Sequence, residues 1–220
     1  MNSKIIKSVI LAIITFLSSG VVYAQQTATE KEIQEYAKQR VGLFCEYITT
    51  IAEKNETLQN RLHFCNRALS LFIGKGGSYT ENGVTRKGVV MEVSSITRKN
   101  ADGTPYVTRR LMKNYLNGLA NLRYDKVVIH HTDIASFKIT DLKPHPTEEN
   151  MWTCTVDIEQ YFEGYSGDGI LKYYDKSVKR ITCYVIKEIY DDIKLGGTKT
   201  EYRVLLGDVQ SLETTKEKLN

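Results

Sequence analysis

The sequence predicts an α+β domain in which N-terminal helices pack against an antiparallel sheet. Through residues 28–73 apolar side chains recur at steps of three and four, the spacing of amphipathic helices. From Tyr124 onward the period changes to two, which is typical of strands with one buried face. Three prolines in 220 residues argue against long linkers and disorder. We therefore expect one domain over residues 25–220.

The first 24 residues read as a signal peptide. Two lysines form a basic n-region, residues 9–17 form an apolar h-region, and residues 22–24 (VYA) match a cleavage site. We expect cleavage between Ala24 and Gln25 and export to the periplasm or the extracellular space. The apolar run is shorter than the ~20 residues of a spanning helix, which argues against stable membrane insertion.

The net charge of the chain bears on whether its partner is a nucleic acid. The formal net charge is +4, and two of the thirty basic side chains lie in the leader, so the mature chain is close to neutral. Nucleic-acid-binding proteins normally carry a basic face. The sequence therefore argues against a nucleic-acid partner.

Two helices are expected at the start of the domain. The first covers residues 28–53 and has a polar start at Thr29. The second follows the break at residues 54–56 and extends to about Ile73. Residues 74–77 (GKGG) end it, because glycine readily adopts the conformation of a helix C-terminus.

The two cysteines of this region have symmetrical positions. Cys45 and Cys65 each lie about ten residues from Asn55 in the break. In a helical hairpin with axes ~8–10 Å apart, facing Cα atoms come within the ~4.4–6.8 Å of a disulfide. Export to an oxidising compartment also favours a bridge. The sequence predicts a Cys45–Cys65 disulfide, with two buried free thiols as the alternative.

A strand, a turn and a third helix follow. Residues 88–96 form the strand candidate, and residues 100–103 (NADG) give a strong turn signal. The third helix is expected to begin at Thr104-Pro105, since proline loses no hydrogen bond at the first helical position. It should end near Leu122.

The remaining residues predict strands over 124–142, 151–163, 178–190 and 200–212, with a turn at Gly164–Gly169. Cys154 and Cys183 are equidistant from Gly167-Asp168 between two of these strands. A hairpin bent there places the two cysteines opposite each other on the inward face. It predicts a second local disulfide, and two buried thiols remain an equal alternative, because a shift of one residue would change the register.

The element order resembles that of the nuclear-transport-factor-2-like superfamily, which includes ketosteroid isomerase, scytalone dehydratase and polyketide-cyclase-like domains. The stretches that match are LSLF at 69–72, TRKG at 85–88, RLMKNYL at 110–116, and the strands with Trp152 and Tyr184. The resemblance covers roughly residues 30–212 and suggests an exported bacterial member. It implies a cystatin-like cone, with a strongly curved antiparallel sheet around the helices and often an apolar pocket. The chain departs from the family at residues 164–176 and 190–200, which we interpret as insertions that lengthen the connections of the sheet. The family's isomerases use a pocket carboxylate and a tyrosine donor, and neither aligns with a particular residue here.

Candidate catalytic residues are few. His130 and His131 are adjacent in a strand, so their side chains point to opposite faces and cannot readily share a metal. Asp157 and Glu159 share a strand face and form a candidate acid–base pair. The simpler interpretations are a half-exposed strand histidine and a solvated polar face. No metal or cofactor is expected.

Tyrosines gather around the predicted hairpin. Tyr161, Tyr165, Tyr173 and Tyr184 combine apolar area with a polar tip, which suits a surface for a protein partner or glycan. The equal alternative is a sheet rich in residues that favour strands.

These observations lead to one hypothesis and two alternatives. The hypothesis is an exported, non-catalytic protein that binds a small apolar ligand, a glycan or a protein partner in or around a cone-shaped pocket. The alternatives are an isomerase- or dehydratase-type enzyme with a pocket carboxylate, and a periplasmic assembly component. A buried polar dyad would favour the enzyme. A purely apolar cavity would favour ligand binding, and an exposed tyrosine-rich face would favour a role in assembly. A homodimer is left open.

Overall fold

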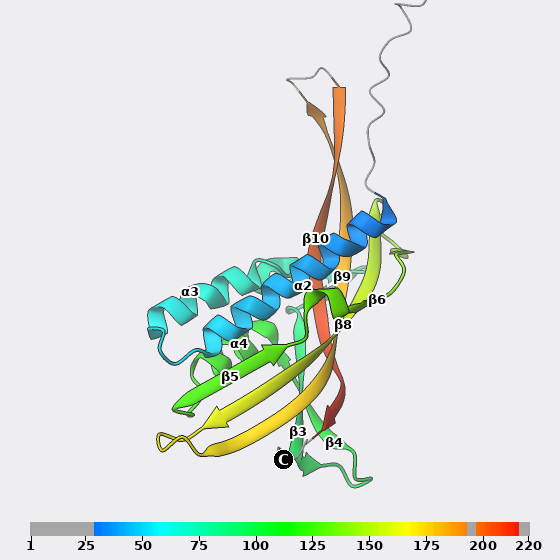
Figure 1. The fold of residues 1–220 in the computed structure, drawn as a ribbon. Coiled ribbons are helices and arrows are strands. Elements are labelled where there is room, and N and C mark those ends of the chain that lie inside the picture. Colours follow the sequence, from blue (N-terminus) through cyan, green and yellow to red (C-terminus); the bar gives the residue numbers. More distant parts are fainter. Residues whose placement is uncertain (1–28, 193–196, 216–220) are drawn as a thin grey trace, which may run out of the picture. The chain divides into compact units, whose positions relative to one another are not determined.

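The computed structural model describes residues 29–192 and 197–215 (Figure 1). The chain divides into two units, one of residues 28–189 and 201–220 and one of residues 1–27 and 190–200. In the smaller unit, Lys199 Nζ lies 5.8 Å from the centroid of the Tyr190 ring. The predicted signal peptide and its cleavage point lie outside the described residues. None of the described helices is long and apolar enough to cross a membrane.

The larger unit combines three α-helices with a large curved sheet, which confirms the α+β class. The helices and short 3-10 turns are α2 (Glu30–Ala52), α3 (Leu58–Leu69), η1 (Ile73–Gly76), α4 (Met112–Ala120) and η2 (Ile134–Ser136). The strands are β1 (Tyr79–Glu81), β2 (Val84–Arg86), β3 (Val90–Lys99), β4 (Pro105–Leu111), β5 (Lys126–His131), β6 (Lys138–Ile139), β7 (Lys143–Pro144), β8 (Met151–Tyr165), β9 (Leu171–Asp192) and β10 (Gly197–Thr215).

The main sheet has the order β4-β3-β10-β9-β8-β5, and β6 and β7 also pair with β8. The β3–β4, β5–β8 and β8–β9 pairs are antiparallel, as expected, whereas β3 and β10 pair in parallel at Met91 and Val209. The short strands β1 and β2 form a separate hairpin. α2 packs against β5 and β8, and α4 packs against β3 and β4.

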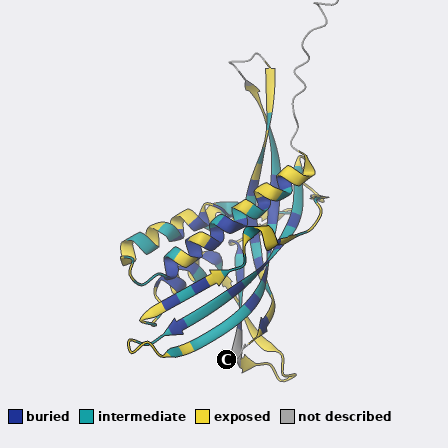
Figure 2. Ribbon diagram, viewed as in Figure 1, coloured by how far each residue is buried: buried dark blue, intermediate teal, exposed yellow. Residues whose placement is uncertain are grey.

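The N-terminal helices form largely where the sequence predicts them. Thr29 and Glu32 form a capping box that satisfies backbone groups at the start of α2. Residues on one face of this helix are buried in the common core and those on the other are exposed (Figure 2). α3 ends at Leu69, earlier than the expected Ile73, and η1 follows it.

The predicted third helix is wrong in its first half. Residues Pro105–Leu111 form strand β4, which pairs with β3 across the predicted turn at 100–103. The helix α4 begins only at Met112. The reason is tertiary: β-branched and aromatic residues at 106–108 suit a strand, and pairing with β3 outweighs the proline start signal.

The strands of the predicted hairpin are longer than expected. β8 extends to Tyr165, and β9 begins at Leu171, so most of the expected turn and insertion at 164–176 belongs to the sheet. Residues 124–142, for which one long strand or two with a kink are expected, contain β5, η2 and β6. The register of β8 and β9 agrees with the expectation, because Cys154 pairs directly with Cys183.

Neither expected disulfide is present, and all four cysteines are buried free thiols. Cys45 lies beside β5, whereas Cys65 Sγ donates to Leu116 O of α4 at 3.6 Å. The helical pair therefore faces two different elements, although α2 and α3 do pack together. In the hairpin pair the two thiols are neighbours but unbridged, and a hydrogen bond with Cys154, together with burial, raises the pKa of the Cys183 thiol.

Candidate functional site

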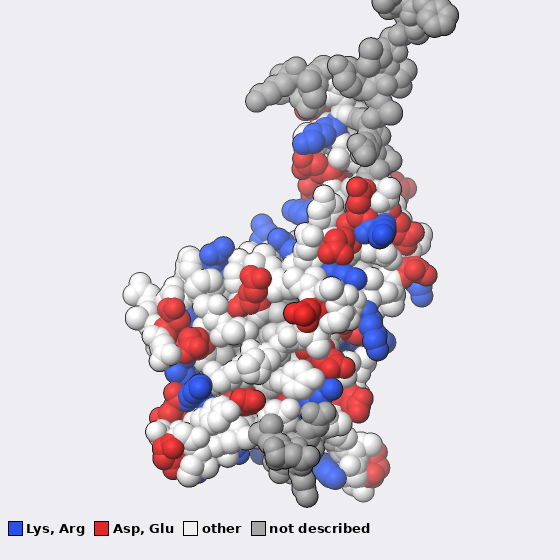
Figure 3. Space-filling view, in the orientation of Figure 1, with Lys and Arg blue, Asp and Glu red and all other residues white. Residues whose placement is uncertain are grey.

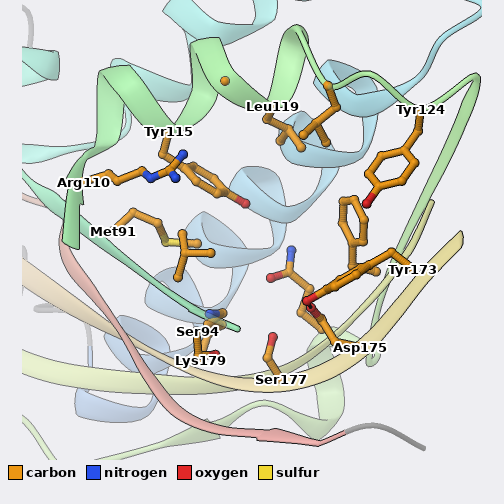
Figure 4. Close-up of a pocket in the computed structure, with 15 residues that line it drawn as sticks. Met91, Ser94, Arg110, Tyr115, Leu119, Tyr124, Tyr173, Asp175, Ser177 and Lys179 are labelled. Carbon is orange, nitrogen blue, oxygen red and sulfur yellow. Dashed lines mark hydrogen bonds between the residues drawn. The ribbon is translucent and has the colours of Figure 1, made fainter. Parts of the chain in front are cut away.

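A cavity of about 280 Å³ lies between α4, β3 and one half of the β8–β9 ladder (Figure 4). Its volume is near the lower end of the roughly 300–1,000 Å³ of small-molecule pockets. The residues that line it are Met91, Val93, Ser94, Arg110, Tyr115, Gly118, Leu119, Leu122, Tyr124, Gln160, Phe162, Tyr173, Asp175, Ser177 and Lys179.

The polar wall of the cavity comes from β9. Successive side chains of a strand alternate between the two faces of its sheet. In β9 the inward positions read Tyr173, Asp175, Ser177 and Lys179, and all four line the cavity. In Figure 4, Asp175 and Tyr173 lie on one side of the cavity and Lys179 lies beside Ser94 on the other.

The remaining wall is largely apolar. It is formed by Met91 and Val93 of β3, by Leu119 of α4, by Leu122 just after that helix, and by Phe162 of β8. Such a wall favours an apolar ligand body, because burial of apolar surface is worth roughly 25 cal/mol per Å².

Gly164 shapes the edge of this wall. A Cβ atom at Gly164 would lie 2.8 Å from the ring of Tyr124, so only glycine lets that ring approach the strand. The Tyr124 ring then packs against Phe162, with centroids 6.0 Å apart, and Phe162 packs against Tyr173 at 5.7 Å. These contacts hold Tyr124 and Tyr173 at the cavity.

Tyr173 and Asp175 form a polar dyad. The Tyr173 hydroxyl donates to Asp175 Oδ2 at 2.7 Å. Burial raises the pKa of the Asp175 carboxyl, against the opposing effects of this hydrogen bond and of Lys179. Directly across the ladder from Asp175 stands the apolar ring of Phe162. A carboxyl with a raised pKa holds its proton more readily than an ordinary aspartate, which suits an acid–base group.

Lys179 is a buried amine, and its residue is 5% exposed. Its Nζ donates to Glu92 O and to Ser211 Oγ, each at 3.1 Å. Burial lowers the pKa of Lys179 to about 8, and the carboxylates of Asp175 and Glu92 oppose this shift. Across the ladder stands Ile158, which offers no polar partner.

Tyr115 of α4 supplies a further hydroxyl. Burial raises the pKa of Tyr115, so the hydroxyl stays protonated and can donate a hydrogen bond. Arg110 is exposed and lines the cavity from the end of β4. The site therefore combines neutral donors, a carboxyl and an amine around an apolar space, which suits a small molecule with one or two oxygen functions.

The histidine candidates lie outside the cavity lining. His130 is exposed on β5, while His131 is half-buried and its Nε2 lies 3.4 Å from Gln160 Nε2. Burial and the neighbouring His130 lower the pKa of His131 to about 4. Gln160, the direct cross-strand partner of His131, itself lines the cavity, so His131 lies beside a cavity residue on the same face of the sheet.

The expected acid–base pair of Asp157 and Glu159 is engaged in ion pairs. Arg180 donates to both oxygens of Asp157, at 2.8 and 2.7 Å. Glu159 Oε2 lies 3.1 Å from Lys176 Nζ. Both side chains are on the opposite face of the ladder from Asp175, because their positions alternate with the buried ones of β8.

The four candidate tyrosines separate in the structure. Tyr173 lines the cavity, and Tyr184 is buried with its hydroxyl bonded to Glu81. Tyr161 and Tyr165 are half-buried, and their hydroxyls donate to Glu159 at 3.2 Å and to Glu163 at 2.6 Å. A shared, exposed tyrosine surface is therefore not formed by these four residues.

Sequence reasoning missed Asp175, Ser177 and Lys179. The signal was present, because extending the alternation backwards from Ile181 and Cys183 places them on the inward face. The expected strand began at residue 178, and residues 164–176 were interpreted as an inserted connection. When a strand is recognised only by alternating hydrophobic residues, a strand whose inward residues are polar looks like a loop.

Charges on the face shown in Figure 3 are mixed, with lysine, arginine, aspartate and glutamate interspersed over the described residues. Among residues 29–192 and 197–215, no group of three or more potential ligands is arranged to hold a metal ion.

Comparisons with known proteins add little to this geometry. No protein-family model matches the chain, and no curated protein matches it. A solved structure from Novosphingobium aromaticivorans, described as a "Putative Scytalone Dehydratase", is similar with a TM-score of 0.40 and 9% identity. The similarity covers 87% of this chain and 92% of that chain. At such values it carries no argument about family or activity.

Proposed function

We propose that the protein binds a small, largely apolar molecule with a carbonyl or hydroxyl group in the cavity. The observation that carries this proposal is the division of the cavity into an apolar wall and the polar row Tyr173, Asp175, Ser177 and Lys179. The apolar wall accommodates the body of the ligand, and the polar row orients its oxygen. The predicted leader supports an exported protein, as does the resemblance to the nuclear-transport-factor-2-like superfamily.

A binding measurement with 2-naphthol tests this function, since the probe has an apolar ring system and one hydroxyl. A Cβ atom at Gly118, which lines the cavity, would meet no atom within 4 Å. Gly118 is exposed at the rim of the cavity, so Gly118→Leu adds a bulky side chain at its mouth, and Gly118→Ala is its matched control. We expect fluorescence titration to show binding that Gly118→Leu weakens at least about tenfold, or 1.4 kcal/mol. Equal binding to both variants would contradict the proposal.

Export has its own test. The proposal keeps cleavage between Ala24 and Gln25, based on the sequence of the leader. N-terminal sequencing of the protein recovered from its producing cells should begin at Gln25. An intact leader on the recovered protein would contradict it.

A second candidate function is proton transfer on the bound molecule, in the manner of an isomerase or dehydratase. The Tyr173–Asp175 dyad favours it, because the carboxyl is half-buried, hydrogen-bonded and beside an apolar space. Asp175 would remove a proton next to a carbonyl, while Tyr115 would donate a hydrogen bond to the developing oxygen charge.

The exchange of α-protons of 1-indanone in D₂O, followed by NMR, tests this candidate without knowledge of the natural substrate. We expect the protein to accelerate exchange and Asp175→Asn to abolish the acceleration. Asp157→Asn is the matched control, since Asp157 lies on the other face of the ladder and is held by Arg180. Exchange that is unchanged in Asp175→Asn would exclude this role.

A further inference from the structure

We propose that Lys179 is a covalent attachment point, whose amine forms an imine with an aldehyde or ketone held in the cavity. The inference deepens the proposed function and rests on it, because the carbonyl compound must first bind. The carbonyl carbon of the ligand would become bonded to Nζ of Lys179.

The position of Lys179 is the first argument. The side chain reaches the cavity from β9, between the polar inward positions and the buried Ile181. In Figure 4 it lies next to Ser94, at the other end of the polar row from Asp175. A ligand that lies along this row therefore meets both the amine and the carboxyl.

The hydrogen bonds of Nζ are the second argument. Its two recorded acceptors, Glu92 O and Ser211 Oγ, are a backbone carbonyl and a hydroxyl. A neutral amine has two N–H bonds and one lone pair, whereas an ammonium has three N–H bonds. Two uncharged acceptors match the neutral amine, and its lone pair then stays available to an electrophile.

The charged and titratable groups around the amine come from several elements. The carboxylates of Asp175 on β9 and Glu92 on β3 favour the ammonium. Glu92 Oε2 accepts from the backbone of Ser211 at 3.1 Å, and its Oε1 lies 3.6 Å from Arg109 Nε, which divides its charge. Arg110, Tyr115, Tyr124 and Tyr173 also line the cavity.

Burial outweighs these carboxylates. With a pKa of about 8, Lys179 at pH 7 contains roughly 300 times more neutral amine than a lysine of ordinary pKa. Lowered pKa values of this kind activate lysines for imine formation.

The chemistry balances with groups that are present. The Nζ lone pair attacks the carbonyl carbon to give a carbinolamine, and the carbonyl oxygen takes up a proton. Loss of water then leaves a C=N bond in place of C=O, and the water carries away the former carbonyl oxygen together with the two amine hydrogens. The Asp175 carboxyl lines the same cavity, and we assign to it the giving and taking back of the transferred proton. No oxidant or reductant is needed.

Reductive trapping tests the inference. The purified protein is treated at pH 7 with 3-phenylpropanal and sodium cyanoborohydride, which reduces an imine to a stable secondary amine, and peptide mass spectrometry locates the 3-phenylpropyl group. We expect modification of Lys179 at least about tenfold faster than that of Lys172, an exposed lysine on the same strand. The rate at Lys179 should level off above pH 8, whereas that at Lys172 should keep rising.

Variants and a competitor complete the test. Lys179→Arg keeps a positive charge but cannot form an imine, and Lys179→Met removes the charge; each should abolish the fast modification, while Lys172→Arg should leave it unchanged. 3-Phenylpropan-1-ol, which can occupy the cavity but forms no imine, should slow the modification of Lys179 in the unaltered protein. This competition needs no variant and so does not depend on how the variants fold.

The outcomes separate the two proposals. If 2-naphthol binds in the cavity but Lys179 is modified no faster than Lys172, the imine is refuted and the binding function stands. If Lys179 is modified quickly but the alcohol gives no protection, the amine is reactive without a cavity-bound ligand, which overturns the inference. Failure of 2-naphthol to bind in the first place contradicts the proposed function itself.

Discussion

The inward face of β9 has two halves that differ sharply, although both halves pair with the same strand, β8. In the first half the inward residues are Tyr173, Asp175, Ser177 and Lys179, which line a cavity. In the second half they are Ile181, Cys183 and Val185, each with no exposed surface. The change from polar to apolar occurs between two consecutive inward positions, 179 and 181.

The difference shows that cavity and core are built on the same ladder. In the apolar half, Ile181 faces Val156 and Cys183 faces Cys154 across β8, and these pairs belong to the common core. In the polar half, Asp175 faces Phe162 and Lys179 faces Ile158, whereas Ser177 faces the polar Gln160. The two ionisable groups are therefore held against apolar ones beside the cavity, an arrangement that is costly for stability and is typical of binding sites.

The largest effect expected from this comparison is on the apolar half. Ile181→Ala should lower the free energy of unfolding by about 2–5 kcal/mol, because it removes a fully buried side chain and leaves a cavity. Ser177→Ala, two inward positions away, should change it by less than about 1 kcal/mol, since its side chain already borders a cavity. Urea unfolding measures both, and similar losses would mean that the two halves are packed alike.

The second prediction concerns Lys179 and pH. Its folded-state pKa of about 8 lies below that of an ordinary lysine, so folding disfavours the ammonium. The resulting penalty is fully present below pH 8 and disappears as the pH rises toward about 10.5. Relative to Lys179→Met, the unaltered protein should gain about 3 kcal/mol of stability over this range.

Chemical unfolding at several pH values measures that difference. The other titrating groups are common to both proteins and cancel when the two curves are subtracted. A flat difference between pH 8 and 10.5 would show that Lys179 is charged and solvated in the folded protein. Lys172→Met provides the exposed control, for which no such pH dependence is expected.

Asp175 should show the opposite dependence on pH, with a smaller size. Burial raises the pKa of this carboxyl, so its contribution to stability is present at low pH and is lost as the pH rises through the folded-state pKa. Asp175→Asn should match the unaltered protein at acid pH and become more stable than it near neutrality, by less than about 1 kcal/mol. Thermal unfolding from pH 4 to 7 measures this, and a variant that is less stable at pH 7 would reverse the assigned sign.

The apolar half is also the part that sequence reasoning predicted well. Alternation around Cys154 and Cys183 gave the correct strands, face and register, because each inward side chain there is hydrophobic. The disulfide that the sequence predicted between these two cysteines is absent, because both thiols are free. Correct register brings two cysteines together, but whether their sulfur atoms bond depends on side-chain geometry that periodicity does not contain.

The polar half and the segment at 105–111 show where the pattern was insufficient. Asp175, Ser177 and Lys179 break the hydrophobic alternation, so the site was interpreted as a connection. Residues 105–111 carry a helix-start signal, yet pairing with β3 makes them a strand. In both places long-range contacts decide the structure, and three residues of the candidate site lie where local preference and tertiary environment disagree.

The smallest predicted effect tests whether the space beside Gly118, which lines the cavity, is open. Gly118 lies inside α4, where glycine is less favourable than alanine by roughly 0.5–1 kcal/mol. Because a Cβ atom there would meet no atom within 4 Å, Gly118→Ala should raise the free energy of unfolding by about this amount. Urea unfolding resolves such a change, and the variant should still bind 2-naphthol. A loss of stability would mean that the space beside Gly118 is closed, against the open rim on which the binding test with Gly118→Leu depends.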